Sequence, residues 1–140
     1  MHLTIDGLDC NRDRLTDEKL VRDFLDQFPE KIGMHKISEP HAFEYHGDKP
    51  EDWGVSGFVL IAESHIAVHT FPEHQQVWVD IFSCKGFETT PSVQMVVDTF
   101  AIGKTQVHLI ERGLEYPHDV KASIPLNRHE RQLQTPIKVR

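Results

Sequence analysis

The sequence predicts an α+β fold, a two-layer sandwich in which an antiparallel sheet carries two helices on one face. Three observations lead to this prediction. Roughly six segments have the alternation or composition of strands, two segments have a helical period, and the links between neighbouring strands are short enough for antiparallel pairing. The predicted order is β-α-β-β-β-β-α-β. At 140 residues the chain is expected to form a single domain, residues 1–140.

A strand and a helix open the chain. Residues 2–5 alternate as a short strand, and a polar turn follows at residues 9–13. From Thr16 the period becomes helical, with Thr16 placed to cap the helix and Pro29 expected to end it or bend its last turn. The apolar residues that recur on one helical face are Leu20, Val21, Phe24, Leu25 and Phe28.

The middle of the chain is predicted to be mainly strand. A short strand at residues 35–38 and a polar loop at residues 39–53 come first, and residues 55–61 are apolar and rich in β-branched types. In the next strand Ile66, Val68 and Thr70 are expected to face one way, and His65, Ala67 and His69 the other. Residues 77–84 repeat the alternation, with Val77, Val79 and Ile81 opposite Trp78, Asp80 and Phe82.

A second helix and a last strand complete the predicted domain. Thr90 is predicted to be the N-cap and Pro91 the first helical residue. Gly103 is expected to end the helix. Residues 106–110 form a last strand, and residues 111–140 are expected to be an irregular extension.

Composition narrows the function classes. The formal net charge of −7 argues against a nucleic-acid-binding protein, and no apolar run approaches the roughly 20 residues of a membrane helix. The start of the chain lacks the features of a signal peptide, so a cytoplasmic location is expected. Cys10 and Cys84 lie far apart with no CxxC pattern, which predicts two free thiols.

Reactive side chains concentrate between Glu63 and Cys84, and several interpretations compete. A metal site is disfavoured because His65 and His69, on one strand, lie about 13 Å apart. The histidines could instead be ordinary side chains on a sheet. A hydrolase would use Ser64 or Cys84 with His69 and Asp80, but the G-x-S-x-G elbow is absent. Considered without its neighbours, Cys84 would be interpreted as a small buried hydrophobic residue.

The string GVSGFVLIAESHIAVHTFPEHQQVWVDIFSC, residues 54–84, favours one interpretation. It closely resembles the S-adenosylmethionine decarboxylases of the small prokaryotic type, pyruvoyl enzymes that make the aminopropyl donor for spermidine. The resemblance covers roughly residues 1–110. Its specific signature is E-S-H, then H-T-F-P-E, then F-S-C at this spacing.

The resemblance implies that the chain cuts itself between Glu63 and Ser64, leaving residues 1–63 and 64–140. The hydroxyl of Ser64 would attack the carbonyl of Glu63, and elimination and hydrolysis would leave a pyruvoyl cofactor derived from Ser64. His69 is the family's candidate for the base that removes the α-proton of Ser64, since imidazoles titrate near neutrality. Ser56 matches a serine that assists processing.

The resemblance also assigns the decarboxylation. The pyruvoyl carbonyl would form an imine with the α-amine of S-adenosylmethionine and accept its electrons. Cys84 matches the proton donor, and thiols are mostly protonated at pH 7. Glu73 matches the carboxylate that binds the ribose hydroxyls. Phe43 and Trp53 are both eligible as the aromatic wall for the sulfonium and adenine, because the preceding loop is longer than in compact members.

Two departures keep alternatives open. The long loop could alter the substrate contacts, so one alternative hypothesis is that the same chemistry acts on arginine or ornithine. A second alternative is that the chain is an uncleaved binding or regulatory homologue. Lys85-Gly86 stands where many members have glycine directly after the cysteine. The family also implies a homodimer of cleaved protomers with sites near the interface, and neither a metal, a nucleic acid nor a membrane is expected as a partner.

Overall fold

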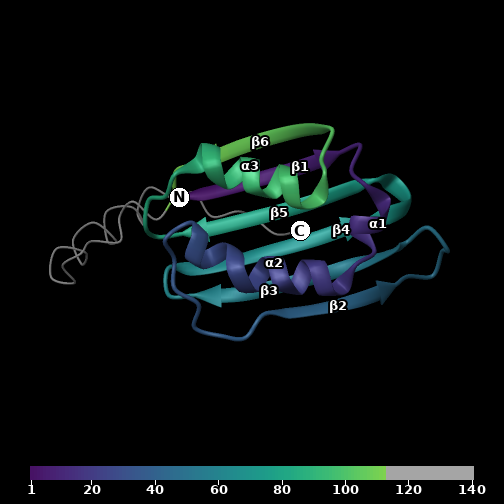
Figure 1. Ribbon diagram of the computed structural model, residues 1–140, viewed down its shortest axis with the longest axis horizontal. Helices are drawn as coiled ribbons and strands as arrows, with labels where there is room; N and C mark the ends of the chain where they lie inside the picture. The colour runs from purple at the N-terminus through teal and green to yellow at the C-terminus, as the bar shows by residue number, and fades with distance from the viewer. Residues whose placement is uncertain (113–140) are drawn as a thin grey trace, which may run out of the picture.

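A six-stranded sheet, antiparallel throughout, forms the centre of the computed structural model, which describes residues 1–112 (Figure 1). The strand order is β2-β3-β4-β5-β1-β6, so the first strand lies between the fifth and the sixth. The strands are β1 (His2–Leu8), β2 (His41–His46), β3 (Trp53–Ile61), β4 (Ser64–Phe71), β5 (Gln76–Ser83) and β6 (Lys104–Ile110).

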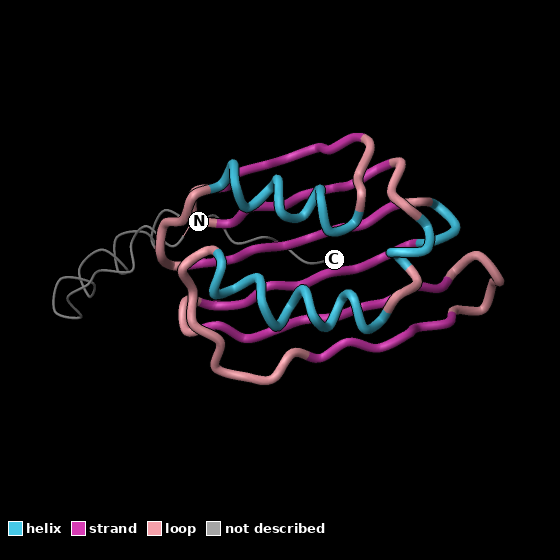
Figure 2. Tube along the Cα trace, in the orientation of Figure 1, coloured by secondary structure: helices cyan, strands magenta, loops and turns pink. Residues whose placement is uncertain are grey.

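Two helices, α2 (Glu18–Lys31) and α3 (Thr89–Phe100), cover one face of the sheet (Figure 2). A single turn, α1 (Arg12–Leu15), precedes α2, and the short 3₁₀ turn η1 (Pro72–His74) links β4 to β5. The predicted α+β sandwich with both helices on one face is therefore confirmed. The opposite face of the sheet carries no helix within residues 1–112, and we call it the open face.

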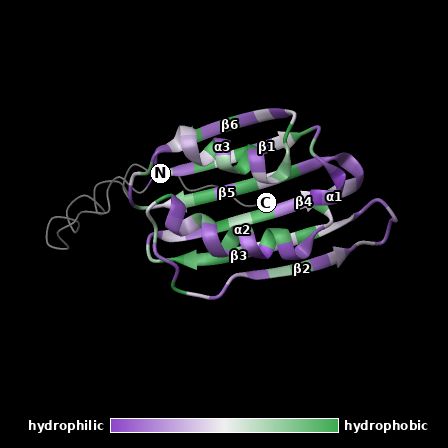
Figure 3. Ribbon diagram, in the orientation of Figure 1, coloured by the Kyte–Doolittle hydropathy of each residue, from purple (hydrophilic) through white to green (hydrophobic). Residues whose placement is uncertain are grey.

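Strict alternation along the strands creates these two faces. The residues predicted to share one face of β4 and β5 are all buried, as is Ser83 at the end of β5. The predicted residues are Ile66, Val68, Thr70, Val77, Val79 and Ile81. These side chains meet apolar residues of the helices, and β3 and β5 accordingly appear largely hydrophobic in Figure 3. At about 25 cal/mol per Å² of buried apolar surface, this layer supplies the main driving force for folding.

The start of α2 differs from the prediction. Asp17, and not Thr16, is the N-cap, and its carboxylate accepts a hydrogen bond of 2.9 Å from the backbone N–H of Leu20. Thr16 instead closes α1, donating its backbone N–H to the carbonyl of Arg12. The helix also continues past Pro29 to Lys31.

The segment before β3 shows the largest error. The strand predicted at residues 35–38 is only an isolated bridge between Lys36 and Ile61, and the predicted loop 39–53 contains the strand β2. Because β2 is an edge strand with only Ala42 buried, its sequence carries no apolar alternation. The sequence therefore looked like a loop.

The second helix is displaced slightly from its predicted start. It begins at Thr89, with Glu88 as an N-cap that makes no side-chain capping bond, so Pro91 is its third residue. It ends at Phe100, before Gly103, and Ala101 adopts the left-handed conformation at φ 48°. The following strand β6 starts two residues earlier than predicted.

Residues 113–140, most of the predicted extension, lie outside the described residues. Across residues 1–112 no helix combines the length and apolar character that crossing a membrane demands. The cytoplasmic location and the single domain spanning residues 1–140 stay predictions.

Candidate active site

The junction between Glu63 and Ser64 lies at a hairpin turn. Ile61 pairs with Ser64, so only Ala62 and Glu63 separate β3 from β4. Ser64 has a backbone φ of 152°, a region that side chains other than glycine rarely adopt. Such conformations cost on the order of 1–3 kcal/mol, so backbone strain is stored at this junction.

The carbonyl oxygen of Glu63 has a specific hydrogen-bond donor. The backbone N–H of Cys84 reaches it at 2.9 Å, because Ser64 pairs with Ser83 across β4 and β5 and Cys84 follows directly. The thiol of Cys84 is exposed, so the interpretation of Cys84 as a buried hydrophobe is wrong. Ser64 Oγ in turn lies 3.2 Å from Nδ1 of His65.

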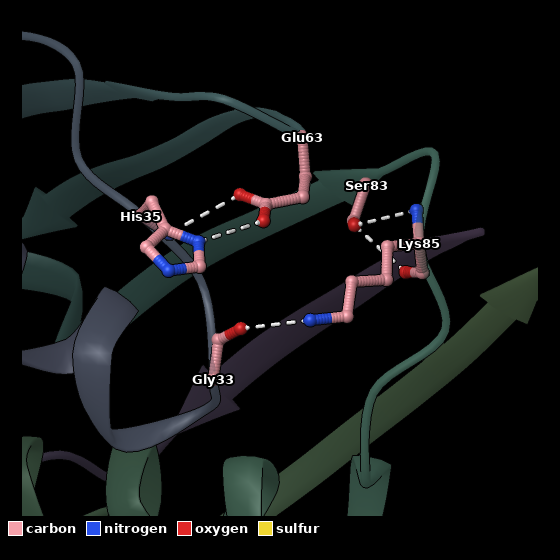
Figure 4. A network of polar contacts seen from close by, with 5 residues as sticks. All are labelled: Gly33, His35, Glu63, Ser83 and Lys85. Atoms are coloured by element: carbon pink, nitrogen blue, oxygen red, sulfur yellow. Dashed lines mark hydrogen bonds and ion pairs between the residues drawn. The ribbon is translucent and has the colours of Figure 1, made fainter.

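The carboxylate of Glu63 is fixed by His35, as Figure 4 shows. It accepts hydrogen bonds from the backbone N–H of His35 at 3.2 Å and shares a contact of 3.3 Å with His35 Nδ1. Desolvation of this carboxyl, whose side chain is 11% exposed, acts to raise its pKa. The hydrogen bonds from His35 outweigh that effect, and the pKa of Glu63 lies below its ordinary value.

A second contact holds the same loop from the other side. The ammonium of Lys85 donates to the carbonyl of Gly33 at 3.1 Å, and Ser83 Oγ bonds both the N–H and the carbonyl of Lys85 (Figure 4). Glu63 and Lys85 are therefore both connected to the loop that follows α2.

A different group of predicted residues lies on the open face. Ser56 Oγ and His69 Nδ1 share a hydrogen bond of 2.9 Å between β3 and β4. Phe43 in β2 is directly opposite Ser56 and is 53% exposed. Directly paired residues share a face, so Phe43, Ser56 and His69 lie in one row across the open face, and we call them one cluster.

The structure does not bring this cluster to Ser64 of the same chain. His69 is five residues further along β4, a separation of about 16 Å in an extended strand. Glu73 lies beyond the far end of β4, in η1. The sequence-predicted site is thus divided between two ends of one strand.

Glu73 and Trp53 contact each other instead. Glu73 Oε1 accepts hydrogen bonds from Arg12 at 2.5 Å and from the indole N–H of Trp53 at 3.1 Å. These two donors, Arg12 first, hold the pKa of Glu73 below its ordinary value. Trp53 is two residues before the buried Val55, so it lies on the helix-covered side of β3. Its ring stacks on that of His46, with centroids 5.6 Å apart.

The geometry also tests the alternatives weighed from sequence. Asp80 bonds to His2 at 2.9 Å and pairs with Ala67 rather than with His69, so a Ser-His-Asp triad is not formed. Among residues 1–112 no three His, Cys, Asp or Glu side chains gather where they could hold a metal ion.

Comparison with known proteins decides the family. Residues 1–113 match the family model described as S-adenosylmethionine decarboxylase. The chain belongs to this family. Two relatives named S-adenosylmethionine decarboxylase proenzyme, from Clostridium botulinum (strain Loch Maree / Type A3) and Thermodesulfovibrio yellowstonii, are each 32% identical to it. The matches cover 80% and 85% of this chain and 92% and 89% of the relatives.

A solved structure of the family supports the same fold. The crystal structure of the adenosylmethionine decarboxylase from Aquifex aeolicus VF5 superposes with a TM-score of 0.66 at 25% identity. The superposition covers 81% of this chain and 89% of that one. The sheet with two helices on one face is therefore the architecture of a family member.

Two contacts were missed in the sequence. The contact between His35 and Glu63 arises because residues 33–38 return to β3, and no local pattern shows that return. The sequence patterns assigned His65 no role at Ser64, only that of a metal ligand or of an ordinary side chain on the sheet, whereas its ring lies beside Ser64 Oγ. The one signal in the sequence for this contact is that His65 directly follows Ser64 in the E-S-H motif.

Proposed function

We propose that this chain is a self-processing pyruvoyl-dependent decarboxylase of S-adenosylmethionine. The observation that carries the proposal is the Glu63–Ser64 junction, where a strained serine follows a carbonyl that accepts the N–H of Cys84. Membership of the family and relatives named as proenzymes support it. A proenzyme needs a cleavage site, and this junction has the required chemistry.

Cleavage begins with Ser64. Its Oγ attacks the carbonyl carbon of Glu63, the C–N bond breaks, and an ester replaces the amide. Loss of the α-proton of Ser64 then expels the Glu63 carboxylate, and water releases the nitrogen as ammonia. Residues 64–140 are left with a pyruvoyl group at their amino end, and residues 1–63 end in a new carboxylate.

The N–H of Cys84 favours the first of these steps. Negative charge develops on the Glu63 carbonyl oxygen when Ser64 adds to the carbon, and a fixed donor at 2.9 Å stabilises that charge. Release of the strain at Ser64 acts in the same direction, because the junction loses its constrained amide.

We propose that the complete site forms between two copies of the chain. His69 and Ser56 are too far from Ser64 within one chain, and their open face exposes large apolar side chains that are each at least 40% accessible. Those on β2 to β5 are Phe43, Tyr45, Phe58, Leu60 and Trp78. Open faces packed together in a homodimer would bury this patch and bring the Ser56–His69 pair of one copy to Ser64 of the other.

The residues present fit a pyruvoyl group formed from Ser64. Once present, that group supplies a ketone that accepts the electrons left when carbon dioxide departs. The exposed thiol of Cys84 holds the proton that replaces the lost carboxylate.

Phe43 is favoured over Trp53 as the aromatic wall for the cationic sulfur, because its ring is exposed on the same face as Ser56 and His69.

Mass spectrometry of the purified protein tests this function. We expect the 16.2 kDa chain to divide into residues 1–63 and 64–140, the second lighter than a serine-terminated chain by the mass of ammonia. Borohydride with S-adenosylmethionine should add substrate-derived mass to fragment 64–140. An intact chain, or a fragment that takes up mass only with arginine or ornithine, would contradict the proposal.

A further inference from the structure

The reacting hydroxyl of Ser64 already has an imidazole beside it in its own chain. Ser64 Oγ and His65 Nδ1 are 3.2 Å apart, within reach for proton transfer. Neighbouring residues of a regular strand point to opposite faces, and the unusual φ of Ser64 accompanies their approach. The strained backbone and the contact are thus features of the same position.

The ring of His65 is held by the sheet around it. His65 is directly opposite Phe82 in β5 and Leu60 in β3, and the rings of His65 and Phe82 meet edge to face with centroids 5.7 Å apart. The imidazole is half-buried there. Its place beside Ser64 Oγ therefore depends on packing as well as on the hydrogen bond.

Self-cleavage needs two proton transfers at two different atoms. The first takes the proton from Ser64 Oγ as the ester forms, and the second takes the proton from Ser64 Cα as the ester is eliminated. His69 bonds Ser56 and cannot contact Ser64 Oγ of its own chain. A second imidazole is available for the first transfer.

We propose that His65 is the catalytic base of ester formation, an assignment that rests on the proposed self-cleavage. Neutral His65, protonated on Nε2, accepts the proton of Ser64 Oγ at Nδ1 as the Oγ–C bond to Glu63 forms. The resulting imidazolium returns this proton to the nitrogen of Ser64 as the C–N bond breaks. The net change is amide to ester, with no proton gained or lost.

The test follows cleavage of freshly translated full-length chain by gel electrophoresis and mass spectrometry. We expect His65→Ala to slow cleavage roughly a hundredfold, the usual effect of removing a general base. Added imidazole should restore much of the rate to this variant. His65→Gln, which keeps a polar side chain of similar length, should be as slow as His65→Ala, and His74→Ala, at the opposite end of β4, should cleave like the wild type.

Hydroxylamine, which cleaves esters, distinguishes His65 from His69. His65→Ala should contain little hydroxylamine-sensitive ester, since it stops before ester formation. His69→Ala should accumulate ester that hydroxylamine cuts at Glu63. Cleavage of His65→Ala and His65→Gln at the wild-type rate, no response to imidazole in a variant with wild-type thermal unfolding, or ester in His65→Ala would each overturn the proposal. A wild-type chain that never cleaves would instead overturn the proposed function.

Discussion

The backbone N–H of Cys84 donates a hydrogen bond of 2.9 Å to the carbonyl oxygen of Glu63. Cys84 therefore contributes two separable groups to the site, a main-chain donor at the junction and an exposed thiol. In the proposed reactions the donor would act on the oxygen that becomes negative during cleavage, and the thiol would act later, on the substrate. Substitutions can remove one group and keep the other.

Cys84→Ala keeps the N–H and loses the thiol, so we expect normal cleavage and a large loss of decarboxylation. Cys84→Pro also loses the N–H, and cleavage should fall about 10²–10³-fold, as when one oxyanion donor is removed. Gel electrophoresis measures cleavage, and release of labelled carbon dioxide measures turnover. Equal cleavage by both variants, with circular dichroism confirming that both are folded, would contradict the role of this donor.

Ser64→Ala removes the attacking oxygen while retaining the hairpin. We expect the chain to stay whole at 16.2 kDa and to have no decarboxylase activity. Ser38→Ala is a suitable control, because Ser38 Oγ accepts the N–H of Leu60 close to the same hairpin but does not contact the junction. Cleavage in Ser64→Ala would remove Ser64 from the reaction.

Mixing two inactive chains tests whether the site is shared between copies. Ser64→Ala keeps His69, and His69→Ala keeps Ser64, so a mixed dimer contains one complete site. Coexpression in equal amounts should allow up to about half of the His69→Ala chains to cleave. Cleavage products are identified by a mass tag on the His69→Ala chain. Their absence in mixed dimers isolated by two affinity tags would show that the site lies within one chain.

His35 is expected to position the scissile junction through the Glu63 carboxylate. His35→Leu removes the ring contact, and because the ring is 79% exposed we expect cleavage to slow only about two- to fivefold. His35→Asn keeps an N–H donor and should cleave close to the wild-type rate. Lys19→Ala, which breaks an exposed ion pair on α2, is the matched control. Rate constants for cleavage provide the comparison, and an Asn variant as slow as the Leu variant would argue for packing alone.

The two thiols should react very differently. Burial raises the pKa of the Cys10 thiol to about 11, with the charge of Asp9 adding to this and a hydrogen bond with Val77 opposing it. The folded chain accommodates the protonated thiol of Cys10 better than the thiolate. The resulting contribution to folding stability is fully present at neutral pH and is lost as pH rises from the ordinary thiol range toward 11. Ellman's reagent at pH 8 should label one thiol rapidly in the wild type and none rapidly in Cys84→Ser. Rapid labelling of Cys10 in the folded protein would contradict its burial.

Sequence patterns predicted the parts of the fold in which one face is buried. The alternation through Ile66 and Val68 and the helical period through Phe24 and Phe28 both reflect burial, and both elements are present. The edge strand β2 was missed because only Ala42 is buried in it. Its place depends on pairing with β3, which residues 41–46 do not encode locally.

The site could be predicted only as a set of residue types. The motif placed Ser64 beside Glu63, but the donor from Cys84 depends on the register between β4 and β5. The separation of His69 from Ser64 follows from their lying on one straight strand. Strain at Ser64 has no sequence signature, since it arises where the hairpin meets the sheet.

The strand order has a consequence for the proposed cleavage between Glu63 and Ser64. Residues 1–63 retain β1, β2 and β3, and residues 64–140 retain β4, β5 and β6. Because β1 is inserted between β5 and β6, and β3 is paired with β4, the two products interdigitate along three hydrogen-bonded seams. The proposed scission would remove one covalent link at a hairpin tip, so the two products could separate only if the hydrogen bonds of the sheet were broken.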